Sequence, residues 1–476
     1  MAEICILYAH EDRNLSKLLN EALSTTHSVW WDDQIHAGDY RAEIESQITK
    51  AKCVIPMWSR HSRVSPNVVD EVTFAKSLEK KILPVKLEDI QAPLGFGGLH
   101  TVDFSGWNGD VAAACYRDLY RNLSAALGNR TVSQRRLFEW KIGDKTRGLP
   151  LLFFSISSFE TAVAPDSAAQ AVALYCPEAA LFSAYDVFNT QSDARSAAFQ
   201  SLEEYRSNGG LVALDSGNYE AARKRDSEWK AEFFHEALAM ASYDFSFSFD
   251  EVLPTGEVPE IVRTVCMAVE RDRRFTSKPI IPIVHAPTDS STGCVNSALL
   301  PQLMQDICRE LNPPLIAVPE RELGDGLFRR AEAVHKIRRS LDDLGFYQPL
   351  HLLGTGNPLS TAVFAAAGAD TFDGLEWCRT VIDEETGRLY HLQQYDLFSF
   401  QTAYAESPIV RESATLATLA YNGKVIFHNL DTFSTWMKQL RKDLQAGKVE
   451  RFLATRLPYP KSNLSSLETA VPGVFD

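Results

Sequence analysis

The sequence of 476 residues lacks the long apolar runs, the paired cysteines and the excess of positive charge that mark several large classes of protein. None of its hydrophobic stretches reaches the roughly 18 consecutive apolar residues that a membrane-spanning helix needs. The first residues, MAEICILYAHEDR, become acidic and polar too early for a secretory signal. We therefore expect a cytoplasmic protein without a membrane partner.

The eight cysteines are scattered singly, and no two are spaced as CxxC or CxC. Most of them stand in apolar runs, as free cysteines of reduced proteins usually do. We therefore expect neither a disulfide framework nor a cysteine-rich zinc site.

Positive charge is scarce, since 48 Lys and Arg stand against 62 Asp and Glu, for a net charge of −14. A general nucleic-acid binder needs clustered basic residues that neutralise phosphates, so this balance argues against that class. The segment 438–461 is a local exception, with seven basic and two acidic residues. A solvated helix face is the favoured interpretation of this segment, and phosphate binding is the alternative.

The length exceeds one ordinary core and predicts two domains. Residues 3–107 alternate short β-type runs with helical patterns of about 10–15 residues, which indicates a parallel sheet with flanking helices. A last helix is expected to end near Leu127. We assign residues 1–127 to this α/β domain and residues 128–148, which are polar and basic, to a partly helical linker.

Eight strand candidates follow the linker, at 149–157, 171–176, 211–215, 243–250, 278–285, 313–318, 349–354 and 371–377. Amphipathic helical stretches separate most of them. Eight strands alternating with helices over about 230 residues predict a (β/α)₈ barrel, with a doubly wound open sheet as the alternative. We place the barrel and a helical extension at 149–445, and a tail rich in Ser and Pro at 446–476.

Several segments of the first domain carry a family resemblance: ILYAHEDR, VWWDDQIHAGDYRAEIESQITKAKCVIPMWS, VKLED and LHTVDFSGW. They resemble the first-strand box of TIR domains, the stretch from their second strand through the BB loop to the third strand, and their late strands. The resemblance covers residues 3–107. It implies a flavodoxin-like fold and self-association through the TIR domains.

TIR domains divide into adaptors and NAD⁺-cleaving enzymes, and the enzymes carry a glutamate on the helix after the third strand. The segment SPNVVDEVTFA places Glu71 there. A carboxylate suits this position because loss of nicotinamide leaves positive charge at ribose C1′, which a nearby anion stabilises.

The same resemblance implies the residues of a nucleotide pocket. Tyr8 and His10 would line it, Trp30 or Trp31 would stack on the nicotinamide or adenine ring, and Asp32 would help to shape the BB loop.

Two departures from the family pattern bear on activity. Leu7 replaces the usual serine of the first box, and Asn67 stands where tryptophan is common. The residues also have ordinary structural interpretations, which remain open at this point. Glu71 could be one more exposed helix carboxylate, and the two adjacent tryptophans could be packing residues.

Four segments of the second domain carry another resemblance: GGLVALDSGNYEA, FSFDEVLP, HLLGTGNPLSTAVFAAAGADTFDGLEWCR and FHNLDTFSTWMKQLRKDL. They are similar, in this order, to segments of tRNA-guanine transglycosylases, (β/α)₈ enzymes that exchange a base at ribose C1′. The resemblance places Asp215 at the general acid/base position, Asp250 at the position that binds the heterocycle, and Asp373 at the nucleophile. Ordinary turn and capping roles for Asp215 and Asp373 are the alternative.

The second domain also departs from that family. Its zinc-binding CxCxxC segment is absent and only His428 remains of the zinc ligands, so we expect no zinc and a capping or packing role for His428. Pro319 and Glu320 stand where the base-binding floor has glycines. His285, at the end of a strand candidate, is equally consistent with a hydrogen-bonded structural histidine and with a ligand-binding residue.

These patterns together predict a TIR-domain NAD⁺ glycohydrolase for which NAD⁺ is a substrate, acting as an effector in antiviral defence. The barrel would sense a nucleic acid or a nucleobase, and the TIR domains would then assemble. One alternative is a base-exchange enzyme acting on RNA or DNA, with the TIR domain as an assembly module. The other is a non-enzymatic signalling adaptor.

Overall fold

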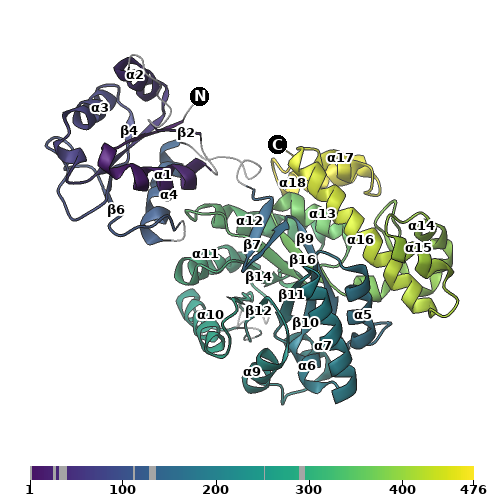
Figure 1. Ribbon diagram of the computed structural model, residues 1–476. Helices are drawn as coiled ribbons and strands as arrows, with labels where there is room; N and C mark the ends of the chain where they lie inside the picture. Colours follow the sequence, from purple (N-terminus) through teal and green to yellow (C-terminus); the bar gives the residue numbers. More distant parts are fainter. Residues whose placement is uncertain are drawn as a thin grey trace. The chain divides into compact units, whose positions relative to one another are not determined.

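The computed structural model describes residues 3–24, 28–31, 40–110, 113–127, 136–250, 252, 254–288 and 295–475. The chain divides into two compact units. Unit 1 comprises residues 1–136 and 342–347, and unit 2 comprises residues 137–341 and 348–476. Figure 1 shows the helices and strands of both units.

Unit 1 is a parallel sheet between helices. Its strands are β1 (Ile4–Leu7), β2 (Val29–Trp30), β3 (Cys53–Trp58), β4 (Lys81–Ile82), β5 (Val85–Lys86) and β6 (Val102–Asp103), and its helices are α1 (Arg13–Ser24), α2 (Tyr40–Lys50), α3 (Pro66–Ser77) and α4 (Ala114–Leu127). The strand order is β2-β1-β3-β5-β6, and β4 also pairs with β3. Because β4 and β5 flank Pro84, which lacks an N–H, they are two short parts of one strand position. The expected flavodoxin-like order is confirmed.

The central strands of unit 1 are buried on both faces, as expected for a parallel sheet. Every residue of β1 and β3 is buried. Alternate side chains enter two core layers, one with Ile4 and Ile55, the other with Cys5 and Val54. This packing fixes the ends of β1 and β3, where the loops that carry the candidate site begin.

Unit 2 contains an eight-stranded parallel sheet that curls into a barrel (Figure 1). Its strands are β9 (Leu151–Ile156), β10 (Ala179–Ser183), β11 (Leu211–Asp215), β12 (Phe245–Phe247), β13 (Ile280–Ile281), β14 (Ile316–Pro319), β15 (Leu350–Leu353) and β16 (Thr371–Gly374). Neighbours follow the chain order, and β16 pairs with β9. A single bridge between Ile283 and Ala317 joins β13 to β14. The predicted barrel-like fold is confirmed.

Helices surround this barrel in alternation with the strands. They are α5 (Pro165–Tyr175), α6 (Ala184–Asn189), α7 (Ser192–Ser207), α8 (Asn218–Lys224), α9 (Ala231–Met240), α10 (Val258–Asp272), α11 (Leu300–Leu311), α12 (Leu327–Asp342), α13 (Pro358–Ala367) and α16 (Tyr421–Gln445). Side chains of the strands, among them Phe153, Phe245 and Phe247, fill the barrel interior. The interior is therefore a packed core, and a ligand site has to lie at the strand ends.

One strand prediction was wrong. Residues 171–175 belong to α5, and the second barrel strand is β10, which begins eight residues after the predicted start. Pro165 opens α5 at a position where a missing N–H costs nothing, and Cys176 ends it in a left-handed conformation with φ 57°. A short apolar run fits a buried helix as well as a strand, and here the flanking residues decide for the helix.

The expected linker is also partly wrong. Residues 128–135 lie outside the described part, but the second half forms a hairpin of β7 (Glu139–Ile142) and β8 (Lys145–Gly148). Trp140 and Ile142 point into the barrel core, and the Trp140 indole N–H donates to the carbonyl of Pro314 (3.0 Å). The hairpin therefore closes the amino-terminal end of the barrel.

A helical extension follows the last strand. It contains the hairpin of β17 (Thr380–Ile382) and β18 (Leu389–His391), and the helices α14 (Ser399–Ala403), α15 (Pro408–Thr415), α17 (Val449–Ala454) and α18 (Pro460–Ala470). The residues 446–476 that we expected as a tail thus carry two helices, with Phe452, Leu453 and Leu467 buried.

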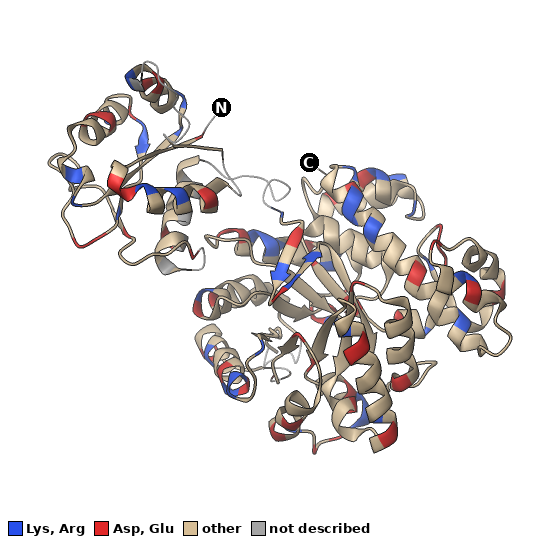
Figure 2. Ribbon diagram, in the orientation of Figure 1, with Lys and Arg blue, Asp and Glu red and all other residues tan. Residues whose placement is uncertain are grey.

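The basic segment 438–461 does not form one helix face, because its charges are distributed over α16, α17 and α18 (Figure 2). Two of its seven basic residues are engaged within the unit. Arg441 pairs with Glu178, and the Arg456 guanidinium lies 3.9 Å from the centroid of the Phe452 ring.

Candidate functional site

The candidate site of unit 1 lies where the strand order of the sheet reverses. Because β1 stands between β2 and β3, the loops that follow β1 and β3 leave the sheet on opposite sides and open a crevice at their carboxyl ends. Ligands of open α/β sheets bind in such a crevice.

A pocket of about 420 Å³ occupies this crevice. Four of the predicted site residues line it: Tyr8, His10, Trp30 and Glu71. The volume lies in the range of pockets that take small molecules and cofactors. The structure thus brings together residues that are up to 63 positions apart in the sequence.

The two adjacent tryptophans separate, as successive residues of a strand do. Trp30 lines the pocket, whereas Trp31 is buried in the core with its ring 6.0 Å from that of Tyr8. Of the two, Trp30 is therefore the one placed to stack on a ligand ring. Asp32 lies outside the described residues.

Glu71 reaches the pocket because of the way α3 begins. Ser65 caps the helix by accepting a hydrogen bond from the Val68 N–H (3.5 Å), and Pro66 occupies the first turn. Val68 and Val72 pack against the sheet, which directs the neighbouring Glu71 to the edge of the crevice, where it is half-buried. Asn67 lines the same pocket.

Residues that are not among the predicted site residues hold the two loops together. The Ser59 hydroxyl donates to Asp12 Oδ2 (2.5 Å). Ser59 Oγ also accepts hydrogen bonds from the backbone N–H groups of His61 and Ser62 (3.1 Å each). Burial raises the pKa of Asp12, while the Ser59 hydrogen bond lowers it. This network joins the loop after β1 to the loop after β3 and places His61 in the pocket wall.

In unit 2, the three predicted aspartates lie at the carboxyl ends of strands. Asp215 ends β11, Asp250 follows β12, and Asp373 lies in β16. Burial raises the pKa of Asp215 well above its ordinary value, and the charges of Glu220, Asp250 and Asp373 raise it further. The three side chains therefore share one acidic region at the mouth of the barrel.

Two of the three aspartates already accept several hydrogen bonds. Asp373 accepts from the Ser155 hydroxyl (2.9 Å) and the Gly354 N–H (2.8 Å), and His351 Nε2 lies 3.3 Å from it. Asp250 accepts from the Ser216 hydroxyl (3.1 Å) and the Asn218 amide (2.9 Å).

Asp215 accepts fewer hydrogen bonds from the described residues than the other two aspartates do. It accepts a hydrogen bond from the Gly217 N–H (3.2 Å), and Gly217 adopts φ 82° with no room for a Cβ, which would lie 2.5 Å from the Tyr185 nitrogen. Among the three aspartates, Asp215 thus keeps the most hydrogen-bonding capacity for a ligand.

His285, whose sequence context fits either a structural or a ligand-binding role, lies at the barrel mouth. Its Nε2 contacts Asp250 Oδ2 and its Nδ1 contacts Glu322 Oε1 (2.7 Å). Burial alone would lower the pKa of His285, but these two carboxylates outweigh it and raise the pKa to about 9. His285 is therefore a buried imidazolium between two carboxylates, and it holds Asp250 in its ionised form.

His428 and Asn429 bind the extension to the barrel by hydrogen bonds. His428 Nε2 lies 2.7 Å from the Ile382 carbonyl, and Nδ1 lies 3.1 Å from the Thr402 hydroxyl. The Asn429 amide donates to the carbonyls of Trp377 and Thr380 (2.7 Å each). Within the described ranges, no three His, Cys, Asp or Glu side chains are grouped so that they could hold a metal ion.

The order of the sheet and the position of the pocket define the N-terminal unit as a flavodoxin-like α/β domain with a ligand crevice at the ends of β1 and β3. The particular family follows from comparison, because the family model described as TIR domain matches residues 4–119. This part of the chain is a TIR domain. A comparison with curated proteins found no match. None of the helices in the described part is both long and apolar enough for a membrane span.

Proposed function

We propose that the TIR domain cleaves NAD⁺ between nicotinamide and ribose, with Glu71 as the carboxylate that stabilises the positive charge at C1′. The observation that carries this proposal is the convergence of Glu71, Trp30, Tyr8 and His10 on one pocket of about 420 Å³. Nicotinamide leaves as a neutral base, and the charge that develops on the ribosyl group is favourable beside a carboxylate.

The other pocket residues have supporting roles in this proposal. Trp30 stacks on an aromatic ring of the substrate, and Tyr8 and His10 contact its polar groups. His61, which faces the same pocket, is a further candidate for contact with the diphosphate.

The test is the release of nicotinamide by the purified protein, measured by chromatography. Glu71→Gln removes the charge at nearly constant volume and is expected to lower turnover by a factor on the order of 10²–10³. The matched control is Asp70→Asn, because Asp70 is the preceding residue of α3 and is exposed. Equal activity of the Glu71→Gln variant and the wild type would refute the proposed role.

We further propose that the barrel regulates this reaction by binding a nucleobase or a nucleic acid, as part of an antiviral effector. The supporting observation is the group of carboxylates at the barrel mouth, in which burial and neighbouring charges raise the pKa of Asp215, whereas His285 lowers the pKa of Asp250, so that the two differ in their readiness to donate or accept a hydrogen bond. TIR domains generally self-associate, which gives ligand binding a route to activation. The expected result is that nicotinamide release rises when a recognised base or nucleic acid is added, and that Asp215→Ala abolishes the rise.

Base exchange is the second candidate function of the barrel, because Asp215 and Asp373 lie in the same mouth. It predicts incorporation of a labelled base into RNA or DNA that depends on Asp373. If Asp373→Asn leaves incorporation unchanged, or if no substrate incorporates the label, the regulatory role is favoured.

A further inference from the structure

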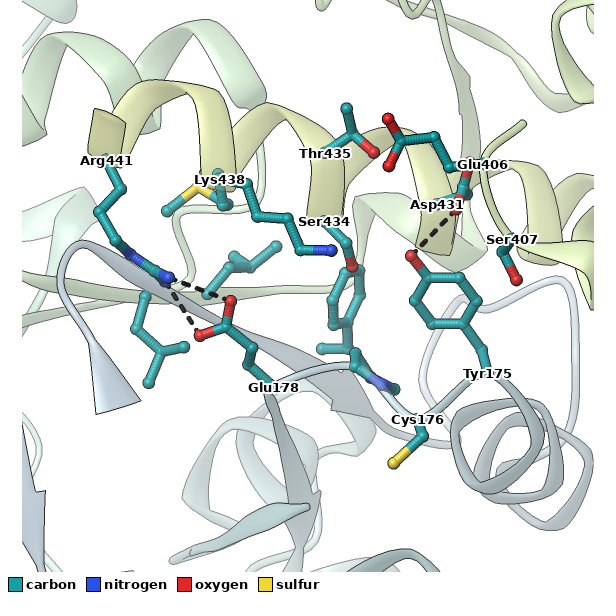
Figure 3. Close-up of a pocket in the computed structure, with 15 residues that line it drawn as sticks. Tyr175, Cys176, Glu178, Glu406, Ser407, Asp431, Ser434, Thr435, Lys438 and Arg441 are labelled. Carbon is teal, nitrogen blue, oxygen red and sulfur yellow. Dashed lines mark hydrogen bonds and ion pairs between the residues drawn. The ribbon is translucent and has the colours of Figure 1, made fainter. Parts of the chain in front are cut away.

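A second pocket, of about 340 Å³, lies in the helical layer of unit 2 (Figure 3). Its walls come from the end of α5, the start of β10, the segment between α14 and α15, and one face of α16. Its floor includes Leu152 and Phe154 of β9. All of its lining residues belong to the described part of the chain, and none of them belongs to the barrel mouth.

Two opposite charges face this pocket without neutralising each other. Glu406 and Lys438 both line it and are both exposed, and neither forms an ion pair with another described residue. Isolated surface charges are common and carry no inference by themselves. Here, however, both border the same cavity.

Between these charges the pocket wall is polar and buried. The Tyr175 hydroxyl donates to Asp431 Oδ1 (3.1 Å), and both side chains point into the pocket (Figure 3). The Ser434 hydroxyl is buried in the same wall. Burial raises the pKa of Asp431 and the nearby Glu406 charge raises it further, whereas the Tyr175 hydrogen bond and the Lys438 charge lower it. Asp431 and Glu406 therefore form a site that a positively charged group would stabilise.

The other end of the pocket is formed by an ion pair. Arg441 binds Glu178 through both terminal nitrogens (3.1 and 3.0 Å), which neutralises that carboxylate. The buried Arg441 Nε has no hydrogen-bond partner among the described residues. Figure 3 shows Glu406, Asp431 and Ser407 on one side and Arg441 on the other, with Lys438 and Ser434 between them. The pocket thus carries the carboxylates of Glu406 and Asp431 at one end, the Lys438 ammonium in its middle and a neutralised ion pair at the other end.

We propose that this pocket binds a small zwitterion of the amino-acid class, with its ammonium group at Glu406 and Asp431 and its carboxylate at Lys438. Such a ligand satisfies both charges at once, which a simple amine or a simple acid does not. The apolar floor of Leu152, Phe154 and Met437 suits an aliphatic side chain. At about 30 Å³ per water, the pocket holds roughly ten waters, which is space for such a molecule.

The test is isothermal titration calorimetry on the full chain with leucine, leucine methyl ester and N-acetyl-leucine. The ester lacks the carboxylate charge and the N-acetyl compound lacks the ammonium charge. The expected result is that leucine binds at least tenfold more tightly than either derivative. The proposal is overturned if a derivative binds as tightly as leucine, or if neither leucine nor any other standard amino acid binds.

Three variants locate the site. Lys438→Met is expected to remove the preference for leucine over its ester, and Glu406→Gln the preference over N-acetyl-leucine. Both side chains are exposed, so the fold is expected to tolerate the changes. Lys442→Met is the matched control, because Lys442 is exposed on the same helix but does not line the pocket. Binding of leucine that none of the pocket variants alters would place it elsewhere and refute the proposal.

Discussion

The buried imidazolium of His285 makes the stability of the barrel depend on pH in a predictable direction. His285→Gln keeps an amide that can donate hydrogen bonds but removes the positive charge between Asp250 and Glu322. The variant is therefore expected to be less stable than the wild type at pH values at which the wild-type His285 is charged. The loss of stability should diminish at pH values at which the wild-type imidazole is neutral.

The magnitude follows from the pKa of His285. The pKa is about 9 in the folded state, against an ordinary value of 6.5, and this difference corresponds to about 3 kcal/mol. Because the folded-state pKa is the higher one, the stabilisation is fully present below pH 6.5. It is lost as the pH rises from 6.5 through about 9.

Urea unfolding followed by circular dichroism measures this effect if the transition of unit 2 is fitted at several pH values. The difference in unfolding free energy between wild type and His285→Gln should shrink by about 3 kcal/mol between pH 6.5 and pH 9. His100→Gln is the control, since His100 is exposed in unit 1. A difference that stays constant over this range would refute the assignment of a charged His285.

The remaining predictions concern other buried charges and the TIR domain. Asp215→Asn should raise the melting temperature at neutral pH, because the folded state disfavours ionisation of Asp215 at pH values above its ordinary pKa of 3.8. The gain in melting temperature should vanish below that pH, and a lower melting temperature of the variant at pH 7 would contradict the prediction. Asp370→Asn should cost roughly 3 kcal/mol in denaturant unfolding, since Asp370 and Arg338 are both fully buried and 3.4 Å apart; a loss below 1 kcal/mol would show that the pair is dispensable. Specific NADase activity should rise with protein concentration if self-association activates the TIR domain, and a constant specific activity in dilution series would exclude this.

Much of the fold could be predicted from hydrophobic periodicity, because most strands of both units are short apolar runs between polar turns. The exceptions have physical reasons. In β10, two alanines precede Leu181, so the strand carries less apolar bulk than AVALYC, which is part of a helix. The β7–β8 hairpin was not predictable because only Trp140 and Ile142 face the core, while the rest of the hairpin is polar.

The candidate site was predictable only in part. The TIR motifs indicated Glu71, Tyr8 and His10, and the structure places them in one pocket. Which tryptophan faces that pocket depends on the phase of β2, which a run of two identical residues cannot specify. The role of His285 was not predictable, since its partners Asp250 and Glu322 are 35 and 37 residues away.

The seam between β13 and β14 has a consequence for the dynamics of the barrel. Two backbone hydrogen bonds cross it, from the Val284 N–H to the Ala317 carbonyl (2.8 Å) and from the Ala317 N–H to the Pro282 carbonyl (3.1 Å). Pro282 has no N–H with which to add another. Local opening of the wall should therefore begin here, and the amide hydrogens of Val284 and Ala317 should exchange with solvent deuterium before those of β9 and β10. His285 links Asp250, which follows β12, to Glu322, which follows β14, and so it bridges this seam. Loss of the His285 charge in alkaline solution should therefore accelerate the exchange beyond the ordinary increase with hydroxide.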